Sequence, residues 1–297
     1  RMNNAIYRSG HLQNSITIDP SNIERAEVIF GSSSVGYGSD AMGGVIHYYT
    51  KNPILKSSEK ISSSFTSSYN SANNSISNNF NTSVSSENWG SITSVSISKY
   101  GDIKMGKNRN HGFSDWGLTP IFSQNSRYNY YTSPSVNSDS NVQKNTGYSQ
   151  VDLFQKFLFK IGESNLLNLN VQFSESSDID RFDQLSIRKD DSLKFSEWYY
   201  GPQKRLLISP SLKIFPNKRF MKKGVITFGF QKINESRVKR KFNSMNRSHQ
   251  IEDLKVFSLN SDFDTSFKNG HSVSYGLETT YNYNYSKAYD RILEVVG

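Results

Sequence analysis

The 297-residue sequence contains no cysteine and no long hydrophobic run. Without cysteine, the chain has no disulfide framework, no thiolate nucleophile and no cysteine metal site. No uncharged apolar stretch approaches the roughly 18 residues that predict a membrane-spanning helix, so a helical membrane protein is excluded. Neither sign of charge dominates strongly, because 35 Lys and Arg face 26 Asp and Glu, a formal net charge of +9.

Aromatic residues are abundant, with 17 Tyr and 19 Phe. A disordered chain is usually poor in aromatics, so this composition indicates a folded protein. From about residue 57 onward, apolar and aromatic residues alternate with Ser, Asn and charged residues. In 272–285, for example, most odd positions are apolar and most even positions are polar. This period of two is typical of β-strands with one apolar and one polar face.

The length of these alternating segments separates two all-β folds. We count about nine strands, and many exceed ten residues, whereas strands in soluble proteins most often have about 5–6. A tilted strand that crosses a bilayer needs about 9–11 residues. The sequence therefore predicts an all-β-dominated fold, a transmembrane antiparallel β-barrel whose apolar parity faces lipid and whose polar parity faces a wet lumen. By periodicity alone, a soluble β-sandwich is the alternative.

The connections between the segments also alternate in length. Short connections are predicted near 86–89, 161–165, 215–224 and 268–270, and longer ones at 101–147, 177–203 and 236–250. Short turns on one side and long loops on the other are typical of outer-membrane barrels.

Residues 23–46 form a glycine-rich segment between two short apolar runs. This segment resembles the C-terminal part of the plug domain of TonB-dependent outer-membrane receptors. The positions that match the family pattern are Arg25, Glu27, Val28, Gly31, Ser34, Tyr37, Gly38, Ala41, Gly43, Gly44, Val45, Ile46, Thr50 and Lys51. Ser32 and Phe30 depart from it, standing where the family usually has Pro and where many members carry a second Arg. A glycine-rich loop between two strands of another fold is the alternative.

The resemblance implies a function for the plug arginines and a subgroup for the chain. In the family, plug arginines pair with barrel glutamates. The resemblance implies this pairing for Arg25, whereas Phe30 stands where the second arginine would be, so the second pairing is not implied. Residues 1–14, 197–205 and 235–242 look similar to segments of a Bacteroidetes-type receptor group, some of whose members are described as haem or haemoglobin receptors.

The family architecture is a barrel of 22 strands filled by an N-terminal plug. The resemblance assigns residues 1–53 to the C-terminal part of an α+β plug domain and 54–297 to the N-terminal part of the barrel. We therefore expect the chain to be an internal fragment of a receptor in the bacterial outer membrane. Its implied function is TonB-dependent, ligand-gated uptake of an iron compound such as haem. Siderophore, cobalamin or glycan uptake, and a non-transporting β-rich surface adhesin, remain alternatives.

The implied partners are TonB with ExbB and ExbD, through a segment absent from this sequence, and outer-membrane lipid and lipopolysaccharide. A surface lipoprotein is a further candidate partner, and nucleic acid is not expected. No resident cofactor or metal is expected, because haem or an iron chelate would enter only as the transported ligand. The sequence has no phosphate-binding glycine loop before a helix, no H-E-x-x-H and no nucleophile elbow, so no enzyme activity is predicted.

The candidate ligand-binding residues lie near the predicted plug apex or in predicted outer loops. Neutral imidazole can bind haem iron, tyrosine rings offer flat amphipathic faces, and a basic run attracts anionic groups such as haem propionates. The candidates are His11, His111, Tyr128, Tyr130, Tyr131, Arg247 and His249. For each histidine, an ordinary surface or hydrogen-bonding function is the alternative.

Two other groups keep two interpretations each. The acidic residues Asp178–Asp183 and Asp190–Asp191 are candidates for calcium binding or for solvated loop charge. The aromatic run Trp198–Tyr200 is a candidate for ligand contact or for an interfacial girdle, whereas the stripe Tyr281, Tyr283 and Tyr285 favours the girdle.

Overall fold

The computed structural model describes residues 17–32, 43–126, 129–216, 218, 220–267 and 270–293. Within these ranges the chain is almost entirely β-structure. The helical turns described are a 3-10 turn at Pro20–Asn22 and the four-residue helix α2 (Phe182–Leu185). No helix in the described ranges is long and apolar enough to cross a membrane.

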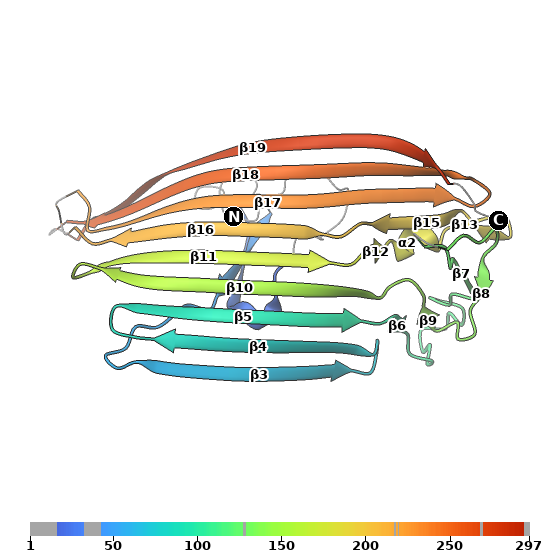
Figure 1. Ribbon diagram of the computed structural model, residues 1–297, viewed down its shortest axis with the longest axis horizontal. Helices are drawn as coiled ribbons and strands as arrows, with labels where there is room; N and C mark the ends of the chain where they lie inside the picture. Colours follow the sequence, from blue (N-terminus) through green and yellow to red (C-terminus); the bar gives the residue numbers. More distant parts are fainter. Residues whose placement is uncertain are drawn as a thin grey trace.

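Nine long strands lie side by side in one antiparallel sheet, in the order in which they follow one another along the chain (Figure 1). They are β3 (Lys60–Asn70), β4 (Ser75–Ser85), β5 (Trp89–Tyr100), β10 (Tyr148–Ile161), β11 (Asn165–Ser176), β16 (Lys204–Ile214), β17 (Lys223–Lys241), β18 (Asn246–Ser266) and β19 (Ser272–Ile292). The predicted all-β antiparallel fold and its approximate strand number are confirmed for the described part of the chain.

Eight shorter strands lie in the two long connections. The first connection, 101–147, holds β6 (Ile103–Lys104) paired with β9 (Val142–Gln143), and β7 (Ile121–Phe122) paired with β8 (Ser135–Val136). The second, 177–203, holds the remaining four, which are β12 (Ile179–Asp180), β13 (Arg188–Lys189), β14 (Ser192–Leu193) and β15 (Phe195–Tyr200). β16 pairs with the first part of β17, and β15 pairs with the last residues of β17. β15 therefore occupies the position next to β17 that β16 would take if it continued past 201–203.

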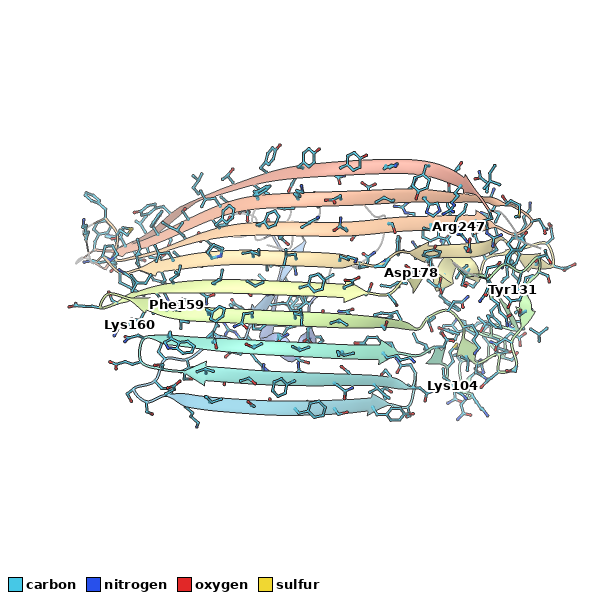
Figure 2. All side chains as sticks on the ribbon, in the orientation of Figure 1. Lys104, Tyr131, Phe159, Lys160, Asp178 and Arg247 are labelled. Atoms are coloured by element: carbon cyan, nitrogen blue, oxygen red, sulfur yellow. The ribbon has the colours of Figure 1, made fainter. Side chains whose placement is uncertain are left out.

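The register of the ladder sorts the alternating side chains onto two faces. Phe65 lies opposite Phe80, Phe80 opposite Val95, and Val95 opposite Leu153, so one parity of each strand shares one face. Aromatic rings stand out along this outward face, including that of Phe159 (Figure 2). Leu259 on the same face is 39% exposed, and Phe257 and Tyr275 are also exposed. These residues therefore do not form a closed dry interior, as a soluble sandwich would require.

The opposite parity faces the plug hairpin, formed by β1 (Ile23–Phe30) and β2 (Gly44–Thr50). This hairpin lies behind the middle of the sheet in Figure 1. The inward face is not uniformly polar, because Ile92 and Phe154 are buried on it, and Ile233, Leu254 and Val256 form a buried apolar cluster. Phe154 lines a crevice with plug residues, so this part of the inner face packs against protein and can hold apolar side chains.

Four short connections lie at one end of the sheet, at 86–88, 162–164, 215–222 and 267–271, as predicted. At the other end, which we call the outer mouth, the connections 101–147 and 177–203 are long. The predicted long loop at 236–250 is wrong, because β17 and β18 continue through it to a turn at 242–245. The residues there are polar, but the backbone ladder still pairs Lys239 with Ser248.

The assignment of faces predicts a large difference between neighbouring positions of one strand. Leu169→Arg on β11 places a guanidinium on the outward face, where a basic residue near the bilayer midplane costs about 2–4 kcal/mol. Asn168→Arg, one residue away, places the same group on the inward face and is expected to cost less than half as much. Unfolding of the full-length receptor from liposomes by denaturant measures both values. Equal losses for the two variants would contradict the outward assignment.

Candidate functional site

The plug hairpin carries most of the described motif residues. Arg25 and Glu27 lie on β1, with Arg25 Nε 2.9 Å from Glu27 Oε1. Tyr49 on β2 donates its hydroxyl proton to Glu27 Oε2 at 3.0 Å, and the Arg25 guanidinium lies 3.7 Å from the Tyr49 ring centre. Arg25 therefore pairs within its own hairpin in this structure. The barrel partner that the family resemblance implies for it stays a prediction.

Two motif glycines have a specific backbone reason. Gly31 follows β1 with φ +87°, a left-handed conformation that other residues rarely adopt. A Cβ atom on Gly44 would lie 2.7 Å from the Ile29 carbonyl oxygen, so the hairpin strands approach too closely for a side chain there. Gly43 has open space around its Cα. Tyr37 and Gly38 lie outside the described residues.

The plug hairpin is anchored to the inward face by a single buried lysine on β10. Lys156 Nζ donates to Thr50 Oγ1 at 2.9 Å, to the Lys51 carbonyl oxygen at 3.1 Å and to Asn52 Oδ1 at 2.8 Å. These three acceptors satisfy all three protons of the ammonium group. A second contact runs from Ser96 Oγ on β5 to Asp19 Oδ2 at 2.6 Å.

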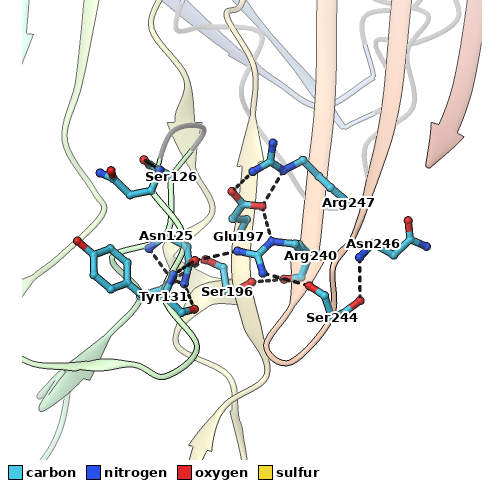
Figure 3. Close-up of polar contacts among 11 residues, drawn as sticks. Asn125, Ser126, Tyr131, Ser196, Glu197, Arg240, Ser244, Asn246 and Arg247 are labelled. Atoms are coloured by element: carbon cyan, nitrogen blue, oxygen red, sulfur yellow. Dashed lines mark hydrogen bonds and ion pairs between the residues drawn. The ribbon is translucent and has the colours of Figure 1, made fainter. Parts of the chain in front are cut away.

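The outer mouth is organised around the buried carboxylate of Glu197 on β15 (Figure 3). Arg240 Nε donates to Glu197 Oε2 at 2.8 Å, and Arg247 donates to both carboxylate oxygens at 2.8 and 2.6 Å. Arg240 also donates to Asn125 Oδ1 at 2.8 Å and to the Ser244 carbonyl oxygen at 3.1 Å. These contacts join the first long connection to β15, β17 and β18.

A second cluster occupies the inward side of β15. Trp198 and Tyr200 pack with Leu185 of α2 and with Phe195, and all four are buried. The Arg181 guanidinium lies 4.7 Å from the Trp198 ring centre and donates to the Tyr200 hydroxyl at 2.6 Å. For Trp198 and Tyr200, neither predicted interpretation is therefore right, because their rings face neither lipid nor an open ligand surface. They form the core of the second long connection.

The structure places the candidate ligand residues at different points of the outer mouth. His111 is exposed, with its ring 5.4 Å from that of Trp116, and it accepts a hydrogen bond from the Phe113 amide at 3.1 Å. Tyr131 is also exposed. Its backbone amide donates to Asn125 Oδ1, and its carbonyl oxygen accepts from Asn125 Nδ2. Lys104, Tyr131, Asp178 and Arg247 all lie at this end of the sheet (Figure 2).

Three other candidates are engaged with neighbours. Arg247 binds Glu197, and the Tyr130 ring lies 4.7 Å from the Arg240 guanidinium. His249 stacks on Tyr289 with ring centres 4.8 Å apart, and its Nε2 atom is buried without a hydrogen-bond partner. His11 and Tyr128 lie outside the described residues. Their functions in ligand binding stay predictions.

Electrostatics at the mouth depend on burial. Burial alone would lower the pKa of Arg247, but its hydrogen bonds to Glu197 and the charges of Glu197 and Tyr199 together outweigh burial and raise it. Burial, and then the charges of Arg247 and Arg291, lower the pKa of His249, so its imidazole is neutral at pH 7. Burial and the nearby carboxylates of Asp178, Asp102 and Glu197 raise the pKa of Asp180 to about 7.

Sequence reasoning singled out Arg247 but missed the partners that surround it. Glu197 and Arg240 stood in segments that resemble receptor loops, yet their contact spans 43 positions in sequence. No motif or pattern in the sequence pointed to Asn125. No calcium-type cluster is found in the described ranges, and Asp183 instead pairs with Arg181.

Removing the central carboxylate is expected to loosen the outer mouth. Glu197→Gln leaves two buried arginines without a counter-charge, and breaking such a pair typically costs about 3–5 kcal/mol. Glu175→Gln is the matched control, because Glu175 pairs with Lys204 at the same 2.6 Å but on the exposed surface, where a pair contributes about 0–1 kcal/mol. Native-state hydrogen exchange of amides 195–200 measures the difference. Equal protection in both variants would contradict the prediction.

The second long connection is expected to be more stable in mild acid. Because the folded pKa of Asp180 lies above its unfolded value of about 3.9, the folded form holds the proton more tightly, and stability falls as pH rises from about 4 to 7. Hydrogen-exchange protection of 177–203, corrected for intrinsic rates, should therefore be greater at pH 5 than at pH 8. Asp180→Asn should remove this part of the pH dependence, and Asp191→Asn in an exposed turn should not. A profile unchanged by Asp180→Asn would refute the assignment.

Residues 1–45 match the family described as TonB-dependent Receptor Plug Domain. This match confirms the resemblance carried by the motif. The match supports the predicted location in the bacterial outer membrane and agrees with the prediction that the chain is not an enzyme. Assignment to a Bacteroidetes-type or haem-binding subgroup stays a prediction. No curated protein sequence matches the chain.

Solved structures that resemble the chain include two receptors. A mutant of the ferric enterobactin receptor of Pseudomonas aeruginosa, in complex with enterobactin, has a TM-score of 0.45 and 14% identity over 82% of this chain. The ferric yersiniabactin uptake receptor of Yersinia pestis has a TM-score of 0.49 and 10% identity over 90% of this chain. The chain spans 36% and 49% of the length of these two receptors.

Proposed function

We propose that this chain, whose N-terminal segment is plug-domain sequence of a TonB-dependent outer-membrane receptor, belongs to an active transporter that takes up an iron-containing ligand, with haem as the first candidate. The observation that supports transport most directly is the plug hairpin anchored by Lys156 to the inward face of the sheet. A surface adhesin has no need of such an obstruction, because its ligand stays outside.

The arrangement supports a gated path rather than an open pore. A ligand that enters from the outer mouth meets the plug behind the inward face. The Lys156 contacts hold Thr50, the last residue of β2, and the two residues after it against β10. Moving the hairpin aside exchanges these three hydrogen bonds for bonds to water, so each one contributes only a modest part of the barrier. In this proposal TonB, energised by ExbB and ExbD, supplies the force. Outer-membrane lipid and lipopolysaccharide surround the barrel, and a surface lipoprotein is a candidate partner at the mouth.

The cargo proposal is supported by the ring systems at the mouth. His111 lies against Trp116 and Phe113, and the exposed Tyr131 offers a flat face nearby in sequence. Flat rings favour contact with a macrocycle, and a neutral imidazole can bind its iron. His249 is neutral at pH 7, as iron binding requires, although its Nε2 atom must first become accessible.

Transport is tested with the full-length receptor in an outer membrane. Under iron limitation, uptake of labelled haem is expected to disappear when TonB is deleted, whereas haem binding at the surface is retained. Uptake that persists without TonB would refute active transport.

The cargo is tested separately by binding. We expect the double variant His11→Ala, His249→Ala to lose at least about tenfold in haem affinity, the scale of losing one good polar contact. His111→Ala is expected to weaken binding in the same direction. His271→Ala is the control, because it lies in a short connection at the opposite end of the sheet. Unchanged haem affinity alongside TonB-dependent uptake of a siderophore would overturn the haem proposal and keep the transporter.

A further inference from the structure

The outward face of β17 and β18 changes from apolar to basic at one row of the ladder. Along β17 the outward residues Ile226, Phe228 and Phe230 are followed by Lys232, and along β18 Leu259 and Phe257 are followed by Lys255. Lys232 and Lys255 are directly opposite each other in the register, and both are exposed. Each strand therefore ends its apolar band with a lysine at the same height.

Placing two lysines directly opposite each other on one face is unfavourable, because like charges at such a pair repel. Neither ammonium has a carboxylate within 4.0 Å among the described residues. The nearest acidic position on β18, Asp253, instead accepts a hydrogen bond from Asn234 at 2.8 Å. Lys204 on the neighbouring β16 shows the compensated case, because Glu175 lies 2.6 Å from it. The Lys232–Lys255 pair thus presents two uncompensated positive charges sideways from the sheet.

The neighbouring strand places this pair at the border of the bilayer. Tyr283 on β19 is the register partner of Lys255, and Tyr281 lies one outward position below it and Tyr285 one above. All three rings are exposed. Tyrosines on the outer face of a barrel gather where hydrocarbon gives way to headgroups. The long lysine stems can lie along the apolar band while their ammonium groups reach the headgroup layer.

We propose that Lys232 and Lys255 form a binding site for the phosphate groups of lipopolysaccharide in the outer leaflet. This inference rests on the proposed function, since it needs the sheet to stand in an outer membrane. A phosphomonoester carries a charge of about −1.5 to −2 at pH 7, which matches two ammonium groups that lack a counter-charge. Lysine binds phosphate as a compact point charge with three donors. The sideways direction of the pair, directly above an apolar band, selects a lipid over a soluble anion or a nucleic acid.

The test uses full-length receptor purified from outer membranes in mild detergent. Native mass spectrometry counts the lipopolysaccharide lipid anchors retained per receptor, and a titration with purified hexa-acylated bisphosphorylated lipid A gives the affinity. For Lys232→Gln, Lys255→Gln we expect at least about a tenfold loss of affinity. Lys204→Gln is the matched control, because Lys204 already has a carboxylate partner, and less than a twofold change is expected.

A second variant separates lipid binding from folding. Lys255→Glu replaces the repulsive cross-strand pair by an attractive one, so the melting temperature should stay equal or rise while lipid A affinity falls at least tenfold. Removing the phosphates from lipid A should reduce binding to the original receptor to the level of the variants. Unchanged affinity in a well-folded Lys255→Glu receptor, or equal binding of free inorganic phosphate, would overturn the site. A receptor that does not fractionate with the outer membrane would instead refute the proposed function.

Discussion

Pairing of the backbone along nine neighbouring strands is the constraint on which the rest of this structure depends. In hydrocarbon every amide and carbonyl of a spanning strand needs an internal partner, and the antiparallel ladder supplies these partners strand by strand. Once the register is set, alternate side chains of each strand point either to the outward or to the inward face of the sheet. The row from Phe65 through Phe80 and Val95 to Leu153 then points outward as a consequence of pairing.

The same constraint explains why the inward face is chemically mixed. A lumen filled by water alone would favour polar side chains at every inward position. Here Lys156 donates to three plug acceptors, while Phe154, two residues earlier on the same face, is buried beside the plug. The chemistry that suits an inward position therefore depends on the plug group that it contacts. This is why an ammonium group and an aromatic ring are both suitable neighbours on one strand.

At the outer mouth three of the nine long strands extend beyond the others. These strands are β17, β18 and β19, and β15 pairs with the last residues of β17. Glu197 then lies where three segments meet, and its single carboxylate holds two arginines from different strands. The buried cluster therefore holds one negative and two positive charges, and its two arginines tie β17 and β18 to β15.

From the sequence alone, alternation and length were sufficient to predict the strands and their two faces, and the plug motif was found by its resemblance to a family pattern. Each of these depends on residues close together in the chain, such as the run from Val273 to Tyr285 or the glycines that let β1 and β2 approach. The continuation of β17 and β18 through 236–250 was missed, because charged residues do not reveal a ladder whose partner lies on the next strand.

Only the tertiary structure shows that Glu197 pairs with Arg240 and Arg247. The same holds for the Tyr130 ring beside the Arg240 guanidinium and for the burial of Trp198 and Tyr200 in the second long connection. A local pattern reports the direction in which a side chain leaves its own backbone. The identity of the group that it meets depends on strand register and loop packing, which are properties of the whole sheet.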